Sequence, residues 1–529
     1  MTLEQLISVY QNWAAQKKLV VEEPKVQVDK IAAKVAAFYE TIRKIVGWTE
    51  EHLLRKAAIA RILRRTIRMR TEGESLAEQL IKDLVRGGYF PNNTIPQRLI
   101  PSLDQILGKY LFLIEKTKKQ NGREKFDLED WLLSVAGCEV EAFLDPPVRE
   151  EALLEFTTEE IKRRLQIDEK AHFNGQEREN LIFIAVRQAL MKLDEPIITY
   201  HLLKKYVPRW TELTVERDRE ALEKFGEELT RWQVSIRKTF NHSFLGKFYW
   251  AAETFDTPYL ILGDILTDLA EANELGPESL ADKEQLKTLA FARYNRRLKR
   301  QRGRAFRAAI YSTISIFVTK VGFTFFIEVP FDRWIGQFSQ NTLYANLGIP
   351  PALMILIVLW GLRPLPQSNA VRVVEELTRI TEGNPKPYFL KLPTRQPFLI
   401  RGLVALLYTL GAAITLAAII YGLTRLNFSA LSQAVFLFFV SLIAYAGTRI
   451  RERSKELVVD EAPPGFIHDV FVFFTFPIVE TGKWFSKQLL RIRSLVIILD
   501  ILIESPVQFL VEFVDQWRSF LREKKQEIR

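Results

Sequence analysis

One lysine in this chain stands where a charge could do chemistry. Lys320 lies about 12 residues into the apolar stretch 308–329, and a lysine at mid-membrane depth costs roughly 3 kcal/mol unless water or a partner receives its charge. Glu328 follows on about the same helix face, roughly 12 Å further along the axis. Asp500 and Glu504, one turn apart in another apolar stretch, are further partner candidates. Three interpretations stay open: a structural buried ion pair, which we favour, a tilted or snorkelling arrangement, and transport or proton handling.

A double proline is the second polar-site candidate. Pro350 and Pro351 fall inside an apolar stretch and close to Asn346. Two prolines remove two backbone donors, so they favour a broken helix of the kind that lines ion sites. We favour a simpler interpretation, in which the span begins at Pro350 with both prolines in its first turn.

Motifs for catalysis are missing from the sequence. It contains no phosphate-binding loop, no dinucleotide fingerprint, no H-E-x-x-H and no nucleophile elbow. The five histidines are scattered, and the lone cysteine, Cys138, allows neither an intramolecular disulfide nor a cysteine-based metal site. We therefore predict no catalytic residue, cofactor or metal, and no enzyme.

The elements around Lys320 are predicted to be membrane spans. The chain has 529 residues, 26% of them charged, and its mean hydropathy of −0.02 conceals a polar first part and an apolar later part. Four stretches have about the 20 residues that cross a bilayer: 308–329, 343–362, 403–423 and 429–447. We predict a helical cytoplasmic domain over 1–283, a basic juxtamembrane helix over 284–307, these four spans within 308–447, and amphipathic or re-entrant helices over 448–529.

Basic residues orient the predicted spans. Three strongly basic sets alternate with loops that hold a single arginine each, and the sets fall on one side of the membrane. The excess of positive charge marks the cytoplasmic side, so both termini are predicted to be cytoplasmic. The net charge of +10 is then explained by anionic lipid headgroups rather than by nucleic acid, which we disfavour as a partner. The lipid-facing basic candidates are Arg296, Arg297, Lys299, Arg300, Arg302, Arg304, Lys483, Lys487, Arg491 and Arg493.

The C-terminal part carries two apolar segments, 466–479 and 495–514. The apolar run in each is too short to cross alone, and the basic residues between them are typical of a headgroup boundary. We expect interfacial or re-entrant helices packed below the four spans. An additional transmembrane pair is the alternative.

The first 283 residues are predicted to be all helical, as a bundle or an irregular solenoid. Prolines and glycines fall mostly between amphipathic runs. We expect Gly137 to end a short helix and 215–240 to form one long charged helix. The arginine-rich helix 55–70 could bind lipid or nucleic acid, but a solvated face or salt bridges to acidic helices is the favoured interpretation.

One resemblance follows from the membrane layout. The run Val318-Thr319-Lys320, then Glu328-Val329-Pro330-Phe331-Asp332, then Pro350-Pro351, resembles a group of uncharacterised bacterial multi-span membrane proteins with long helical cytoplasmic N-terminal regions. It covers about the C-terminal 40% of the chain. It implies architecture only, and no activity. Our lead interpretation places the protein in the bacterial cytoplasmic (inner) membrane.

These observations predict a membrane protein that presents a helical scaffold domain, with an unknown protein partner, at the cytoplasmic face. The alternative is a small oligomeric channel or transporter that uses Lys320 and a broken second span. Small residues in 403–423 also leave a homo-oligomer open.

Overall fold

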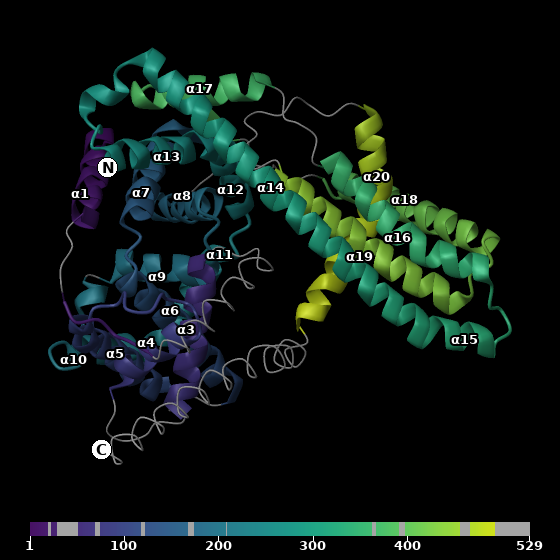
Figure 1. Ribbon diagram of the computed structural model, residues 1–529, viewed down its shortest axis with the longest axis horizontal. Helices are drawn as coiled ribbons and strands as arrows, with labels where there is room; N and C mark the ends of the chain where they lie inside the picture. The colour runs from purple at the N-terminus through teal and green to yellow at the C-terminus, as the bar shows by residue number, and fades with distance from the viewer. Residues whose placement is uncertain are drawn as a thin grey trace, which may run out of the picture. The chain divides into compact units, whose positions relative to one another are not determined.

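The computed structural model describes residues 1–18, 23–28, 51–68, 75–117, 122–167, 174–207, 209–361, 367–390, 397–454 and 466–491. The described chain is mostly helical, which confirms the all-α prediction (Figure 1). It separates into two compact units. Of the described residues, unit 1 comprises those from Met1 to Asp282 together with Thr381–Leu390, and unit 2 comprises Lys283–Ile380 and those from 397 to 491.

Unit 1 is built from short helices joined by tight connections. In chain order they are α1 (Leu3–Lys18), α3 (Glu51–Arg68), α4 (Leu76–Arg86), η1 (Gln97–Leu99), α5 (Ile100–Thr117), α6 (Gly122–Leu144), α7 (Val148–Arg164), α8 (Gly175–Leu190), α9 (Glu195–Tyr206), η2 (Trp210–Glu212), α10 (Arg219–Glu227), α11 (Leu229–Phe240), α12 (Leu245–Thr254), α13 (Asp256–Ala272) and η3 (Pro277–Leu280). Local signals end several of them. Ser75 caps the start of α4 by accepting a bond from the backbone of Glu78, and Gly87 caps its end.

Two helix boundaries in unit 1 differ from those expected. Gly137 does not end a helix: α6 continues through it, and a Cβ there would lie 2.7 Å from the backbone oxygen of Lys56 on α3. Gly137 therefore allows close packing of two helices. The stretch 215–240 is also two helices, α10 and α11, which meet at Glu228.

The arginine-rich helix α3 is tied down by acidic partners. Arg55 contacts Glu141 at 2.9 Å, and Arg64 contacts Asp130 at 2.8 Å. Lys56 pairs with Asp194. For the described part of that helix, these pairs agree with the favoured interpretation, a solvated face or salt bridges to acidic helices.

A two-stranded parallel sheet brings a distant segment into unit 1. Strand β1 (Leu165–Ile167) pairs with strand β2 (Tyr388–Leu390), so that Leu165 lies opposite Tyr388. Tyr388 also packs edge-on against Phe255, with ring centroids 5.4 Å apart. The segment between the predicted second and third spans thus returns to the N-terminal unit.

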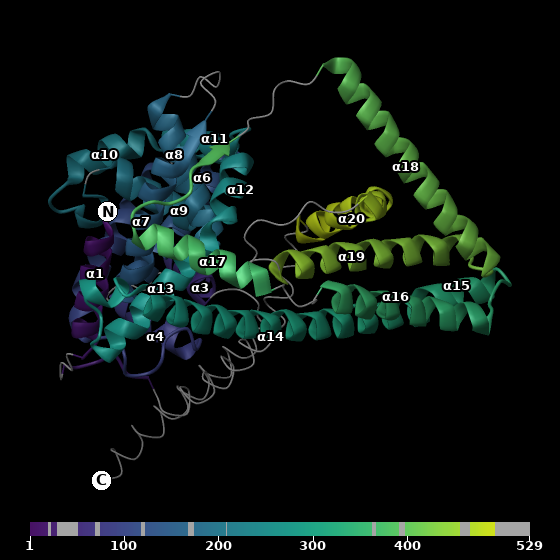
Figure 2. The ribbon, with the colours of Figure 1, turned by 90° about the horizontal axis from the view of Figure 1, so that it is seen from above.

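Unit 2 consists of long helices. They are α14 (Lys283–Phe323), the π-helical segment η4 (Thr324–Glu328), α15 (Val329–Trp334), α16 (Gln340–Gly361), α17 (Gln367–Thr381, of which the last residue falls in unit 1), α18 (Phe398–Arg425), α19 (Ala430–Ser454) and α20 (Phe466–Arg491). The long helices α14, α16 and α19 run side by side (Figures 1 and 2). The predicted juxtamembrane helix and first span are therefore one continuous helix that extends to Trp334 through η4 and α15.

Three described helices are long and apolar enough to cross a membrane: Lys283–Trp334, Phe398–Arg425 and Ala430–Arg449. They correspond to the predicted spans one, three and four. Their apolar side chains face outward: only 6% of the most apolar part of α18 is buried. Such an apolar surface is foreign to a water-soluble monomer, and these helices indicate an integral membrane protein. The predicted span 343–362 falls on α16, which is not among the three.

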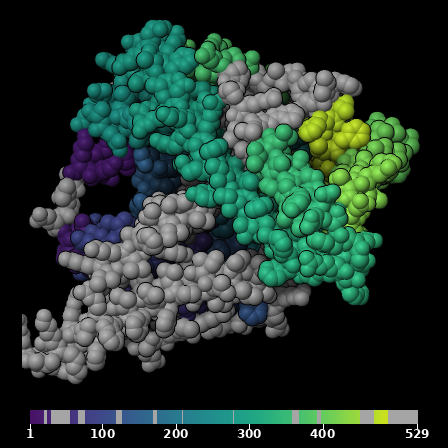
Figure 3. Space-filling view, turned by 45° about the vertical axis from the view of Figure 1, so that its right-hand side comes forward, coloured from purple at the N-terminus to yellow at the C-terminus, as the bar shows by residue number. Residues whose placement is uncertain are grey.

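Helix α20 differs from the expected short interfacial segments. It is one helix of 26 residues that includes Pro477 and the basic residues after it. Phe473 packs on Tyr408 of α18, and Phe485 packs on Phe438 of α19. The helix lies between α18 and α19 (Figure 2) and against them in the space-filling view, where it is yellow (Figure 3). It thus packs beside the middle of these helices rather than below their ends. The segment 495–514 lies outside the described residues.

Candidate functional site

A stripe of buried polar residues runs along the first membrane helix. Lys320, Thr324, Glu328 and Asp332 follow one another at four-residue spacing, and each is less than 10% exposed. In an α-helix of 3.6 residues per turn this spacing would drift by about 40° at every step. The π-helical segment has more residues per turn and counters the drift between Thr324 and Glu328. The stripe therefore keeps facing α16 and α19 along its length.

The middle of the stripe is a fully buried ion pair. The Lys320 Nζ lies 2.7 Å from the Glu328 Oε1, and their side chains are 0% and 1% exposed. Thr324 donates its hydroxyl to the same carboxylate oxygen at 3.0 Å. The ammonium also stands 5.2 Å from the ring centre of Phe439 on α19. Of the three interpretations of Lys320, the geometry matches the buried ion pair.

Asn346 of α16 completes the ion pair from the opposite helix. Its Nδ2 donates to the second carboxylate oxygen of Glu328. Because a carboxylate only accepts hydrogen bonds, the amide nitrogen must face it, and the amide oxygen is the atom left over. Asn346 is 3% exposed. The sequence analysis treated Lys320 and Asn346 as two separate polar-site candidates. In the structure both bind the Glu328 carboxylate.

The end of the stripe meets α19. Ser432 donates its hydroxyl to the Asp332 Oδ2 at 2.9 Å. One turn before Asn346, Thr342 donates to the backbone oxygen of Leu426 at 3.0 Å. Two buried oxygens here, the Asp332 Oδ1 and the Asn346 Oδ1, have no hydrogen-bond partner among the described residues. Asp332 is thus part of the site. The sequence analysis named it only as part of a resembling run and not as a site candidate.

The double proline lies within the helix that carries Asn346. Helix α16 runs from Gln340 to Gly361 with Pro350 and Pro351 inside it. It does not break at the prolines, so the expected break is wrong, and the prolines do not lie in the first turn of their helix. That the membrane span begins at Pro350 stays a prediction. A proline nitrogen carries no hydrogen. The backbone oxygens of Asn346 and Leu347, four residues back, therefore receive no helical bond from positions 350 and 351.

The remaining predicted residues do not join this site. Asp500, Glu504 and Arg493 lie outside the described residues. The basic candidates on α14 precede its apolar part: Arg296, Lys299, Arg300 and Arg304 are exposed, and Arg297 and Arg302 are partly buried. On α20, Lys487 is exposed and Lys483 pairs with Glu480 at 2.8 Å. Arg491 is the last residue of that helix.

Unit 1 holds a second buried charge cluster, which sequence reasoning missed. The Lys109 Nζ lies 2.7 Å from the Glu139 Oε1 and 2.8 Å from the backbone oxygen of Trp210. Tyr110 and the indole of Trp210 donate to the other oxygen of Glu139, at 2.6 Å and 2.8 Å. Three donors thus surround one carboxylate in the core. Charged residues at apolar-face positions of α5 and α6 were the available signal.

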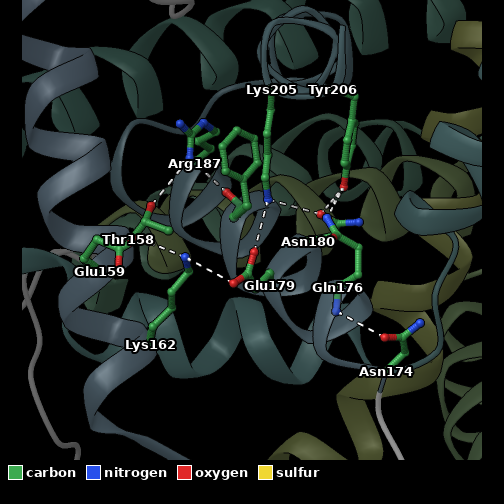
Figure 4. A network of polar contacts seen from close by, with 11 residues as sticks. Thr158, Glu159, Lys162, Asn174, Gln176, Glu179, Asn180, Arg187, Lys205 and Tyr206 are labelled. Atoms are coloured by element: carbon green, nitrogen blue, oxygen red, sulfur yellow. Dashed lines mark hydrogen bonds and ion pairs between the residues drawn. The ribbon is translucent and has the colours of Figure 1, made fainter. Parts of the chain in front are cut away.

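A half-exposed polar network joins α7, α8 and α9 (Figure 4). Glu179 stands between Lys162, at 3.8 Å, and Lys205, at 3.7 Å. Lys205 and Tyr206 also donate to the Asn180 side chain. The network links residues far apart in sequence and holds these three helices together. Glu159 and Glu179 offset the charges of Lys162 and Lys205 within it.

His201, beside this network, is buried in its neutral form. Arg187 donates from Nε to the His201 Nδ1 at 3.2 Å, which places the histidine's own proton on Nε2, 3.6 Å from Glu151. Burial, with Arg187 and Lys204 nearby, holds the pKa of His201 well below its ordinary value of 6.5. Burial likewise lowers the pKa of Arg187 to about 9.

The neutral state of His201 predicts a loss of stability in acid. Below about pH 6.5 the unfolded chain takes up a proton that folded His201 refuses, so the free energy of unfolding falls as pH is lowered, by at most about 1.4 kcal/mol per pH unit. Above that pH this contribution is constant. His201→Gln keeps an acceptor for Arg187 but does not titrate, and its stability is expected to depend less on pH between 5 and 7. Denaturant unfolding of the detergent-solubilised protein measures this, and equal slopes for both proteins would contradict it.

The described part of the chain shows neither a metal-binding cluster nor a reactive cysteine. No group of three or more histidine, cysteine, aspartate or glutamate residues there could hold a metal ion. Burial raises the pKa of the Cys138 thiol to about 12, so it is a poor nucleophile. No family model, no curated protein and no solved structure matches the chain. Only the contacts within this chain therefore bear on what the buried polar stripe does.

Proposed function

We propose that this protein holds a helical interaction domain, unit 1, at the cytoplasmic face of a bacterial inner membrane through four spans. The observation that carries the proposal is the continuity of α14, whose 41 residues begin where unit 1 ends and end in the apolar part of a membrane helix. At 1.5 Å per residue it is about 60 Å long. One uninterrupted helix thus links the domain to the bilayer.

Strand β2 supports α16 as the fourth span. The chain leaves unit 1 at Asp282, and β2 brings it back to β1. Such a return needs an even number of crossings. The helix Lys283–Trp334 supplies one, and α17 has 15 residues, too few for a second. Helix α16, with 22 residues, has the length.

Cysteine labelling tests this topology. In a Cys138→Ala background, Asn384→Cys before β2 and Gln337→Cys between α15 and α16 both introduce an exposed thiol. A membrane-impermeant maleimide is expected to label position 337 in intact cells, and position 384 only in inside-out vesicles. Labelling of both positions from the same side would contradict a crossing by α16.

Anionic lipid headgroups are proposed as partners of the basic residues on α14. Arg296, Lys299, Arg300 and Arg304 are exposed directly before the apolar part of α14. Each contributes about 1 kcal/mol of attraction to an anionic surface, and together they favour the cytoplasmic side. Both termini are accordingly proposed to be cytoplasmic.

A protein partner is proposed to bind exposed aromatic residues of unit 1. Trp250 on α12 and Phe389 on β2 are 61% and 69% exposed, and their two elements pack together. Large aromatic side chains are enriched where proteins bind each other. A photo-crosslinking residue at position 250 in native cells is expected to yield an adduct that Phe389→Ala weakens. The same residue at Val234, 59% exposed on α11, is the control. Equal adducts at both positions, or none at 250, would count against the surface.

Transport is the second candidate function. The buried stripe from Lys320 to Asp332 favours it, because charged residues inside membrane helices mark ion and proton routes in many transporters. An oligomer of this chain would supply further spans. The expected pairing of Lys320 with a break in the second span no longer supports it, since α16 is continuous.

A further inference from the structure

We propose that Asp332 and Asn346 form a binding site for one sodium-like monovalent cation, between the first membrane helix, α16 and α19. The site needs only the packing described within unit 2. It does not depend on the interaction domain proposed above.

The charges of the stripe leave one negative charge unbalanced. Lys320 neutralises Glu328. Asp332 is 8% exposed, and no basic group lies within ion-pair distance of it among the described residues. Its described hydrogen-bond partner is the neutral hydroxyl of Ser432. A buried carboxylate without a counter-charge is strongly unfavourable, so the site has room for one positive charge.

Two buried oxygen atoms in this part of the stripe have no described donor. The Asp332 Oδ1 and the Asn346 Oδ1 are both buried without a described hydrogen-bond partner. Glu328 connects them, since it lies one helical turn from Asp332 and accepts the bond from the Asn346 nitrogen. Leftover acceptors, rather than donors, are what a bound cation requires. A carboxylate and an amide oxygen are the ligand types that hard cations prefer.

The double proline leaves two backbone oxygens of α16 without their usual donors. Because positions 350 and 351 have no N–H, the backbone oxygens of Asn346 and Leu347 are released from the helical pattern. Asn346, whose amide oxygen is unpaired, precedes Pro350 by about one turn of α16.

The charge and ligand count favour a monovalent ion. Glu328 is already neutralised, which leaves a single carboxylate for the cation. A calcium ion takes six to eight oxygens, several of them from carboxylates. The described site has only one carboxylate that is not already neutralised, that of Asp332. A net charge of −1 matches an ion of charge +1.

Direct binding of radioactive sodium tests the proposal. The full-length protein is purified in detergent with choline chloride in place of sodium chloride, and ²²Na⁺ binding is measured at pH 8. We expect saturable binding of about one ion per chain, displaced by unlabelled sodium but not by choline. Asp332→Asn, which keeps the size and the hydrogen bond to Ser432, is expected to weaken binding at least 10-fold. Asn346→Ala is expected to weaken it as well.

Controls separate binding from folding. Asp469→Asn, an exposed residue on α20, is expected to bind sodium like the wild type. Size-exclusion profiles establish that each variant is folded, and sodium is expected to raise the Tm of the wild type but not of Asp332→Asn. Absence of saturable binding by the folded wild type would overturn the proposal. Unchanged binding by Asp332→Asn would overturn the placement of the site.

Discussion

Replacing Lys320 by methionine is expected to destabilise the membrane unit by about 3–5 kcal/mol. The variant leaves the Glu328 carboxylate buried with only Thr324 and Asn346 as partners, and an uncompensated buried charge carries a penalty of that size. Denaturant or thermal unfolding of the purified protein in detergent measures the loss.

The double variant Lys320→Met with Glu328→Gln sharpens this test. It removes both charges while glutamine still accepts from Thr324, so the combined loss is expected to fall below the sum of the single losses by about 2 kcal/mol or more. Lys483→Met is the control, because the Lys483–Glu480 pair is 40% and 43% exposed and such pairs contribute about 0–1 kcal/mol. Equal losses for Lys320→Met and Lys483→Met would show that the burial of Lys320 carries no energetic weight.

Replacing Glu139 by glutamine is expected to cost unit 1 about 3 kcal/mol or more. The substitution removes the counter-charge of Lys109, which is 0% exposed, and turns one accepting oxygen into a donor that faces Tyr110 or Trp210. Denaturant unfolding followed by tryptophan fluorescence, to which Trp210 contributes, measures the loss.

The exposed pair Arg209–Glu212 provides the matched comparison. Its side chains are 70% and 55% exposed at a separation of 2.7 Å. Glu212→Gln is expected to change the free energy of unfolding by less than about 1 kcal/mol. A similar small change for Glu139→Gln would mean that Lys109 reaches water, against the described burial.

The spans and the salt bridges of α3 could be predicted because their signals are local. A run of about 20 apolar residues must be a helix in a bilayer, whatever it packs against. Ser75 and Gly87 bound α4 for a similar reason, since caps satisfy backbone groups within one turn. The excess of arginine on α3 likewise called for nearby acidic partners.

Gly137 and the double proline were misinterpreted because their roles depend on other helices. Glycine locally favours a helix end over a helix interior, and the close approach of the α3 backbone alone reveals why Gly137 lies inside α6. Pro350 and Pro351 weaken α16 locally. Packing against α14 and α19 keeps the helix continuous, and propensity does not report that packing.

Taken alone, the sequence predicted that this chain is helical, that apolar helices long enough to cross a membrane follow a basic segment, and that Lys320 lies in the middle of one of them. These properties follow from composition and spacing within about 20 residues. Tertiary structure decided which groups meet. The π-helical segment aligned Glu328 with Lys320, α16 supplied Asn346, and α19 supplied Ser432. Each of these contacts depends on how helices far apart in the chain are packed and rotated, and no local pattern specifies that.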